Sequence, residues 1–186
     1  TGLPKGDEIA EDSAAGAALR ADIRRTIETG GYNQEYEAEG LILGYSYDAS
    51  PVIVPDGTPP VAQPVSEYRP TARPGARAPH GWIADGASTL DLFGDGLTLL
   101  RFGASGAALV DAAAAAGVPL SAHDIDDDGI AALYESPLVL VRPDGHVCWR
   151  GTDEDCDART VIDTVRGMAP GTTAATRQST EQYAER

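Results

Sequence analysis

The chain has 186 residues, of which 42% are hydrophobic, and this is enough for one well-buried domain with appendages. Its formal net charge of −15 disfavours nucleic acid and anionic membrane surfaces as partners. No apolar stretch approaches the length of a membrane span, and the N-terminus lacks the basic-then-apolar pattern of a signal peptide. We therefore expect a cytoplasmic protein, and the start at Thr1 instead of a methionine makes excision or processing from something longer a further expectation.

The first segment, residues 1–54, begins with a predicted helix. Ser13 or Asp12 can cap this helix, and Gly30 and Gly31 end it. Its apolar stripe is narrow, with arginines beside it. A helix of this kind needs a larger body on which to pack.

Two short strands are predicted next, over residues 41–46 and 52–54. A strand pair of this length is marginal alone, because it cannot bury enough surface. Residues 55–79 hold most of the prolines of the chain, which predicts an extended, semi-rigid connector.

Residues 80–168 have the most regular pattern. After a short helix at residues 88–94, glycines, prolines and turn residues divide the sequence into strands and helices. In order, the predicted elements are strand 97–102, helix 106–117, strand 120–126, helix 128–135, a hairpin of 138–142 with 146–150, and helix 157–168. This βαβαββα order predicts an α/β sandwich with a mixed sheet and a thioredoxin-like layout. A polar tail, residues 169–186, follows.

A thioredoxin-like redox site would lie in the turn after the first of these strands, where a helix N-terminus stabilises a thiolate. Residues 103–107 occupy that turn and contain no cysteine. Cys148 and Cys156 lie elsewhere and are expected to be unpaired, so a thiol enzyme that uses Cys148 is the least favoured hypothesis. Two further hypotheses concern this layout: a cis peptide bond between Ser136 and Pro137, and an anion at the N-terminus of the helix that starts at residue 106.

An acidic stretch fits the ligand spacing of an EF-hand calcium loop. The matching residues are Asp124, Asp126, Asp128, Gly129 and Glu135. The flanking sequence disagrees, because a strand precedes the loop and Ser136-Pro137 halts any helix after it. The favoured interpretation is an acidic turn in which Asp128 caps a helix, and calcium binding is the alternative.

The three histidines, His80, His123 and His146, have no paired spacing that marks a metal site, so we expect structural or surface roles. The sequence also lacks a GxSxG elbow and a complete glycine loop for phosphate. We therefore assign no catalytic, cofactor-binding or metal-binding residue to this chain.

Four segments in a specific order carry a family resemblance. They are LGYSYDASPVIVPDGTPP, YRPTARPGARAPHGWI, STLDLFGDGLTLLRFG and SPLVLVRPDGHVCWRG. Over about residues 17–168 the chain resembles the C-terminal region of class A FAD-dependent aromatic-ring monooxygenases of the phenol hydroxylase and aromatic polyketide hydroxylase type. The resemblance implies that residues 1–54 are the end of the FAD and substrate region, 55–79 a connector, and 80–168 a thioredoxin-like domain without CxxC.

The resemblance also implies a function for the parent enzyme, which would hydroxylate an aromatic ring with FAD, NAD(P)H and dioxygen. The flavin-binding motifs of such enzymes are missing here, so no residue is carried over as catalytic. We expect a structural and docking portion, possible partners being the missing N-terminal domains and a second copy. The alternative is a free-standing, non-enzymatic binding or oligomerisation module, with a calcium response through the stretch from Asp124 to Glu135 as an option. Exposed side chains at Leu41, Ile42, Ile53 and Trp82 would favour the docking portion.

Overall fold

The centre of the computed structural model is a four-stranded mixed sheet. The structure describes residues 6–29, 37–84 and 86–168. The strands are β3 (Leu97–Arg101), β4 (Leu120–Asp124), β5 (Leu138–Val141) and β6 (Val147–Gly151). Their order is β4-β3-β5-β6, with β3 parallel to β4 and β5 antiparallel to both β3 and β6. The predicted thioredoxin-like α/β layout is confirmed.

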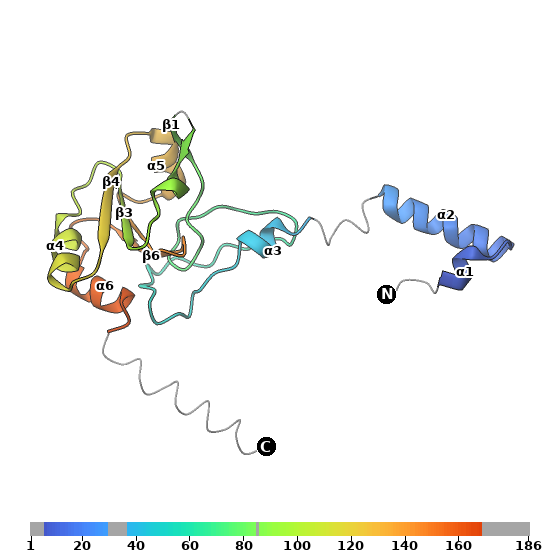
Figure 1. The fold of residues 1–186 in the computed structure, drawn as a ribbon, viewed down its shortest axis with the longest axis horizontal. Helices are drawn as coiled ribbons and strands as arrows, with labels where there is room; N and C mark the ends of the chain where they lie inside the picture. The colour runs from blue at the N-terminus through green and yellow to red at the C-terminus, as the bar shows by residue number, and fades with distance from the viewer. Residues whose placement is uncertain (1–5, 30–36, 85, 169–186) are drawn as a thin grey trace, which may run out of the picture.

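Helices cover both faces of this sheet, as Figure 1 shows. On β3, Leu99 packs with α4 (Ala107–Ala115) and α6 (Ala158–Val165), while the next residue, Leu100, packs with α5 (Asp128–Tyr134). This alternation follows from the two-residue period of a strand. Because both faces are covered, the strand is apolar almost throughout, as predicted. We call the four strands with α4, α5 and α6 the sandwich.

Local signals set the element boundaries in the sandwich. The side chain of Asp127, one residue before the predicted cap Asp128, accepts a hydrogen bond of 2.9 Å from the Ile130 amide and begins α5. The hairpin turn between β5 and β6 closes with a 2.9 Å bond from the Gly145 amide to the Arg142 carbonyl. Gly145 has a φ of 78°, which glycine adopts without strain.

The hypothesis of a cis bond between Ser136 and Pro137 is wrong, because no cis peptide bond occurs among the described residues. The chain reverses one residue earlier, at Glu135, whose φ of 57° is left-handed. The bond between Ser136 and Pro137 is trans, which is the intrinsically favoured isomer. With the bend at Glu135 in place, the Pro137 carbonyl accepts a 2.8 Å hydrogen bond from the Phe102 amide.

At the N-terminal end, α1 (Gly6–Ala10) is followed by α2 (Ala14–Glu28). The prediction that Ser13 caps this helix is confirmed, since its hydroxyl accepts a 3.0 Å bond from the Gly16 amide. The predicted stop at residues 30–31 lies outside the described residues. At 15 residues α2 is the longest described helix, and no helix in the described ranges has the length and apolarity to cross a membrane.

The two predicted N-terminal strands are wrong. Residues Glu39–Leu43 form the short helix α3, and residues 52–54 lie outside any strand. The helical turn is closed by a 2.8 Å bond from the Ile42 amide to the Ala38 carbonyl. Gly40, inside the turn, packs against the backbone at Pro64. A contact between residues so far apart in the sequence leaves no periodic pattern from which it could be predicted.

The connector segment lies against the sandwich rather than apart from it. Its backbone pairs with β6 and the preceding turn: Gly75 donates to Val147 at 2.8 Å, and Ala78 donates to Gly145 at 2.9 Å. Upstream, Val54 donates to Cys148 at 2.8 Å. These bonds cover the β6 edge of the sheet, which would otherwise present unpaired backbone N–H and C=O groups. A small hairpin of β1 (Trp82–Ala84) and β2 (Ala87–Ser88), then a 3-10 turn (Thr89–Leu92), lead into β3.

Two arginines fasten the connector. Arg150 of β6 contacts the Asp56 carboxylate at 2.6 Å and the Glu135 carboxylate at 2.9 Å. Arg73 pairs with Asp48 and donates to the Thr58 carbonyl at 2.9 Å. Both guanidinium groups therefore join segments that are distant in the sequence.

Candidate docking surface

The position of a thioredoxin-like redox site, at the C-terminal end of β3, is filled by an internal carboxylate. Asp153 accepts hydrogen bonds from the backbone amides of Ser105 at 2.9 Å and Gly106 at 2.8 Å. Gly106 is the N-cap of α4 and has a left-handed φ of 58°. The helix N-terminus thus already holds a negative charge, which argues against the hypothesis of an external anion at this place.

Replacing Asp153 by alanine is expected to lower the free energy of unfolding by about 1 kcal/mol, because two amides at the start of α4 lose their acceptor. Urea denaturation at pH 7 measures the change. The matched control is Glu154→Ala, whose side chain is exposed and has no described hydrogen bond. Equal losses for the two variants would contradict the capping role.

Neither cysteine is activated. Both are unpaired, as predicted. Burial raises the pKa of Cys148 to about 12, and its thiol donates to the Leu140 carbonyl at 3.3 Å. Burial, then the carboxylates of Asp153 and Asp157, raise the pKa of Cys156. A nucleophilic thiol needs the opposite shift, so this environment does not support a thiol enzyme.

We expect Cys148 to resist a thiol reagent such as dithionitrobenzoate in the native protein and to react fully in urea, because its side chain has no exposed surface. Cys156, half-buried in an acidic loop, should react slowly in the native state. Mass spectrometry of the labelled peptides separates the two sites. Rapid labelling of Cys148 in the native protein would contradict this expectation, since it would mean that solvent reaches the Cys148 thiol on β6.

The acidic stretch that matches a calcium loop is used in other contacts. Asp124 ends β4 and pairs with Arg101 at 2.7 Å, while Glu135 pairs with Arg150 at 2.9 Å. The first and last candidate ligands are thus already bound to arginines, and a strand precedes the loop. Within the described residues, no three His, Cys, Asp or Glu side chains form a group that suits a metal ion.

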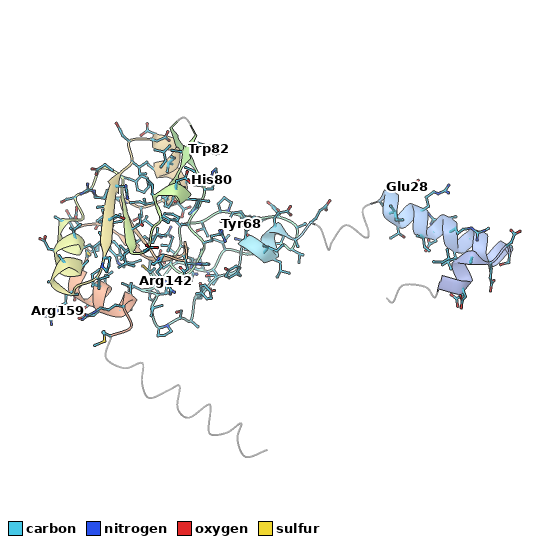
Figure 2. All side chains as sticks on the ribbon, viewed as in Figure 1. Glu28, Tyr68, His80, Trp82, Arg142 and Arg159 are labelled. Carbon is cyan, nitrogen blue, oxygen red and sulfur yellow. The ribbon has the colours of Figure 1, made fainter. Side chains whose placement is uncertain are left out.

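The histidines lie in separate places. His80 stacks edge-on against Trp82, with 4.9 Å between ring centroids, and Figure 2 shows the two side by side near β1. His146 is buried under Tyr45 and Tyr47, at centroid distances of 5.3 and 4.8 Å. His123 is on β4. His146 therefore helps to fasten the tyrosine segment to the hairpin turn, which fits the structural role predicted for it.

Helix α2 has an unburied apolar stripe. Only Gly16 of this helix is buried, and Ile27 is largely exposed. The guanidinium of Arg20 folds back onto the end of α1, where it donates to the carbonyls of Ile9 at 2.7 Å and Glu11 at 2.9 Å. These bonds hold α1 and α2 together without covering the stripe.

A second exposed apolar surface lies on an arm, which we define as residues 39–47 and 60–69. In Figure 1, α3 is at the far end of this arm, away from the strands. Its exposed aliphatic side chains are Leu41, Ile42, Val61 and Val65. Of the four positions expected to be exposed in a docking portion, Leu41, Ile42 and Trp82 are exposed. The prediction for Ile53 is wrong, because it is buried in the core beside β6.

Comparisons with known proteins agree with this architecture. A family model described as "Aromatic-ring hydroxylase, C-terminal" matches residues 71–169. The FAD-dependent monooxygenase apdD of Emericella nidulans is 35% identical over an alignment of 153 residues, and the match covers 75% of this chain and 24% of that protein. The 2,4-dichlorophenol 6-monooxygenase of Delftia acidovorans is 36% identical over an alignment of 163 residues, and the match covers 76% of this chain and 27% of the relative.

Among solved structures, the rebeccamycin biosynthetic enzyme RebC with reduced flavin has a TM-score of 0.73 at 40% identity. The match covers 91% of this chain and 31% of that one. The chain therefore spans about a quarter to a third of the length of these relatives, two of which are monooxygenases by name and two of which carry FAD or flavin in their descriptions. Because the family model covers more than half of its residues, the chain belongs to the aromatic-ring hydroxylase C-terminal family.

Proposed function

We propose that this chain is the C-terminal structural and docking portion of a cytoplasmic FAD-dependent aromatic hydroxylase and is not catalytic on its own. The observation that carries the proposal is the family match over residues 71–169, in a chain that spans only 24–27% of its curated relatives. In this proposal residues 1–54 end the FAD and substrate region, 55–79 connect, 80–168 form the thioredoxin-like domain, and 169–186 are a tail.

The apolar stripe of α2 supports docking. A helix with one apolar side normally buries it, and burying one isoleucine or leucine contributes about 1.5–3 kcal/mol. Here Ile27 is exposed, and Leu19 and Ile23 are only half-buried. A body that precedes this chain in the same polypeptide would cover these side chains.

Two features of the described residues support the assignment of FAD to another part of the enzyme. The helix N-terminus that a pyrophosphate would use is taken by Asp153, which would repel it. The cavity between α4 and α6 measures about 270 Å³ and is lined by three alanines, Ile162, Asp163 and two arginines. This is below the size of sites for drug-sized ligands, and FAD is larger. We therefore assign FAD and NAD(P)H to the preceding part of the enzyme.

The test is to purify the native protein and compare it with the 186-residue chain. A longer polypeptide with an oxidised flavin spectrum, which oxidises NAD(P)H when given a phenolic or polyketide aromatic, is the expected result. The 186-residue chain alone should be colourless and inactive. A native product of this length without flavin would refute the proposal and favour a free-standing binding or oligomerisation module. The proposal also includes self-association with a second copy, and light scattering of the purified protein tests it.

A further inference from the structure

Aspartate followed by glycine can rearrange without an enzyme. The glycine amide nitrogen attacks the side-chain carboxyl carbon of the aspartate, a C–N bond forms and water leaves, which closes a five-membered succinimide ring. Water then opens the ring at one of its two carbonyls, giving back aspartate or giving isoaspartate, whose backbone runs through the side-chain carboxyl. The chain has this pair at residues 56–57, 85–86, 95–96, 128–129 and 144–145.

Two of these pairs are held by hydrogen bonds. The Asp56 carboxylate accepts a bond of 2.6 Å from Arg150. The Asp144 carboxylate accepts one of 2.9 Å from Arg142, and the amide of Gly145, which would have to attack, donates to the Arg142 carbonyl at 2.9 Å. Because bonds to a charged group must open before either ring can close, both pairs should react slowly.

A third pair is part of a helix. Asp128 and Gly129 form the first turn of α5, which is held by the Asp127 side chain through its 2.9 Å bond from the Ile130 amide. Ring closure there requires this turn to unwind first. The pair at residues 85–86 begins outside the described residues, so the inference concerns the other four.

The pair Asp95-Gly96 has neither kind of restraint. It lies between the 3-10 turn and β3, and Asp95 is exposed. Neither the Asp95 carboxylate nor the Gly96 amide makes a hydrogen bond to a described residue. Before the pair, Gly94 has open space around its α-carbon. Beside the pair is a cavity of about 180 Å³, lined also by Pro119 and Pro143, which gives room for a ring and for water.

We propose that Asp95-Gly96 is a site of spontaneous isoaspartate formation, and that the product disturbs the start of β3. This inference does not depend on the proposed function. Isoaspartate adds one methylene to the backbone just before Leu97, whose amide donates to the Pro119 carbonyl at 2.9 Å. Gly96 packs on the same carbonyl through its α-carbon, since a Cβ there would lie 2.6 Å from the oxygen. The longer backbone displaces these two contacts.

The test is to keep the 186-residue chain at neutral pH in water enriched in heavy oxygen, both native and in guanidinium chloride. Each cycle of ring closure and opening leaves one heavy oxygen in the pair. Digestion in ordinary water and mass spectrometry with fragmentation of the peptides locate it. In the native chain, Asp95 should gain label at least about tenfold faster than Asp56 or Asp144, because their charged hydrogen bonds must first open. In guanidinium chloride the rates should become similar.

Asp95→Glu keeps the charge but would need a six-membered ring, which closes far more slowly, so labelling of this pair should stop. The matched control is Asp111→Glu, the same change at an exposed aspartate followed by alanine, which should leave the labelling of Asp95 unchanged. After chromatographic separation, the isoaspartate form should exchange the Leu97 amide with deuterium faster than the fresh chain.

Two outcomes would overturn the site. One is equal labelling of Asp95 and Asp56 in the native chain. The other is an unlabelled Asp95 in the native chain while the denatured chain reacts. Unchanged exchange of the Leu97 amide in the isoaspartate form would instead overturn the effect on β3. The flavin content of the native protein has no part in these readouts, so failure here leaves the proposed function untouched.

Discussion

Replacing Leu99 by alanine is expected to lower the free energy of unfolding of this chain by about 2–5 kcal/mol. Leu99 is at the centre of β3 and has no exposed surface. It packs in the core cluster that α4 and α6 share with the sheet, and its side chain touches the start of α4 at Gly106. Truncation removes the buried methyl groups and their packing contacts, while the neighbouring side chains stay in place, and this leaves a cavity in a closely packed layer.

Urea denaturation followed by tryptophan fluorescence measures this loss, because Trp149 lies in the same core cluster. The matched control is Leu41→Ala, which removes the same atoms from a largely exposed position and should change the stability by less than about 0.5 kcal/mol. A similar loss for both variants would show that burial in the sandwich does not determine the stability of this chain.

The sandwich could be predicted because its signals are local. The apolar runs of β3 and β5, the glycine in the turn at Gly145 and a helix cap at each acidic turn all agree on the same elements. Even the error at α5 is a shift of one residue, from Asp128 to Asp127. Agreement between several local signals is what makes a segment predictable.

The arm and the place of the connector along β6 could not be predicted, because distant contacts determine them. The side chains of residues 41–46 alternate in the pattern of a strand. The structure nevertheless has the helix α3 over Glu39–Leu43, where Gly40 packs on the backbone of Pro64. Ile53 was expected on the surface and is buried, because the neighbouring Val54 pairs with Cys148, far along the chain. Tertiary contacts of this range override local propensity.

The same reason applies to the candidate site. Residues 103–107 contain no cysteine, and the sequence therefore predicts no thiol redox site in this turn. The carboxylate that fills the place comes from Asp153, 47 residues after Gly106, and acidic residues are too common in this chain for one of them to stand out. A helix N-terminus without its own side-chain cap was the one available signal that a distant acceptor was needed.

Arg150→Ala is the second change with a large expected effect, a loss of roughly 2–3 kcal/mol in the free energy of unfolding. The Arg150 side chain is only 11% exposed and makes charged hydrogen bonds to Asp56 at 2.6 Å and Glu135 at 2.9 Å. Without it, the Asp56 carboxylate remains in a mostly buried place without its cation. The connector would then be held near Ile53 by fewer contacts.

The pH dependence of stability should report the same contact. Burial by itself would raise the pKa of Asp56, but hydrogen bonds from Thr58 and Arg150 outweigh it and lower the pKa. Because the pKa of Asp56 is lower in the folded than in the unfolded protein, its contribution is complete above the unfolded value, about 4. This contribution to the free energy of unfolding is lost as the pH falls through the folded value. The difference in urea stability between wild type and Arg150→Ala should therefore be smaller at pH 3 than at pH 7.

A double-mutant cycle separates the two carboxylates that Arg150 contacts. Coupling between Arg150→Ala and Asp56→Asn should exceed about 1 kcal/mol, since this pair is largely shielded from water. Coupling to Glu135→Gln should stay below about 0.5 kcal/mol, because the Glu135 side chain is 56% exposed and its ion pair is screened. The reverse order would mean that Arg150 chiefly supports the left-handed turn at Glu135, and that the connector is held by its backbone bonds to β6.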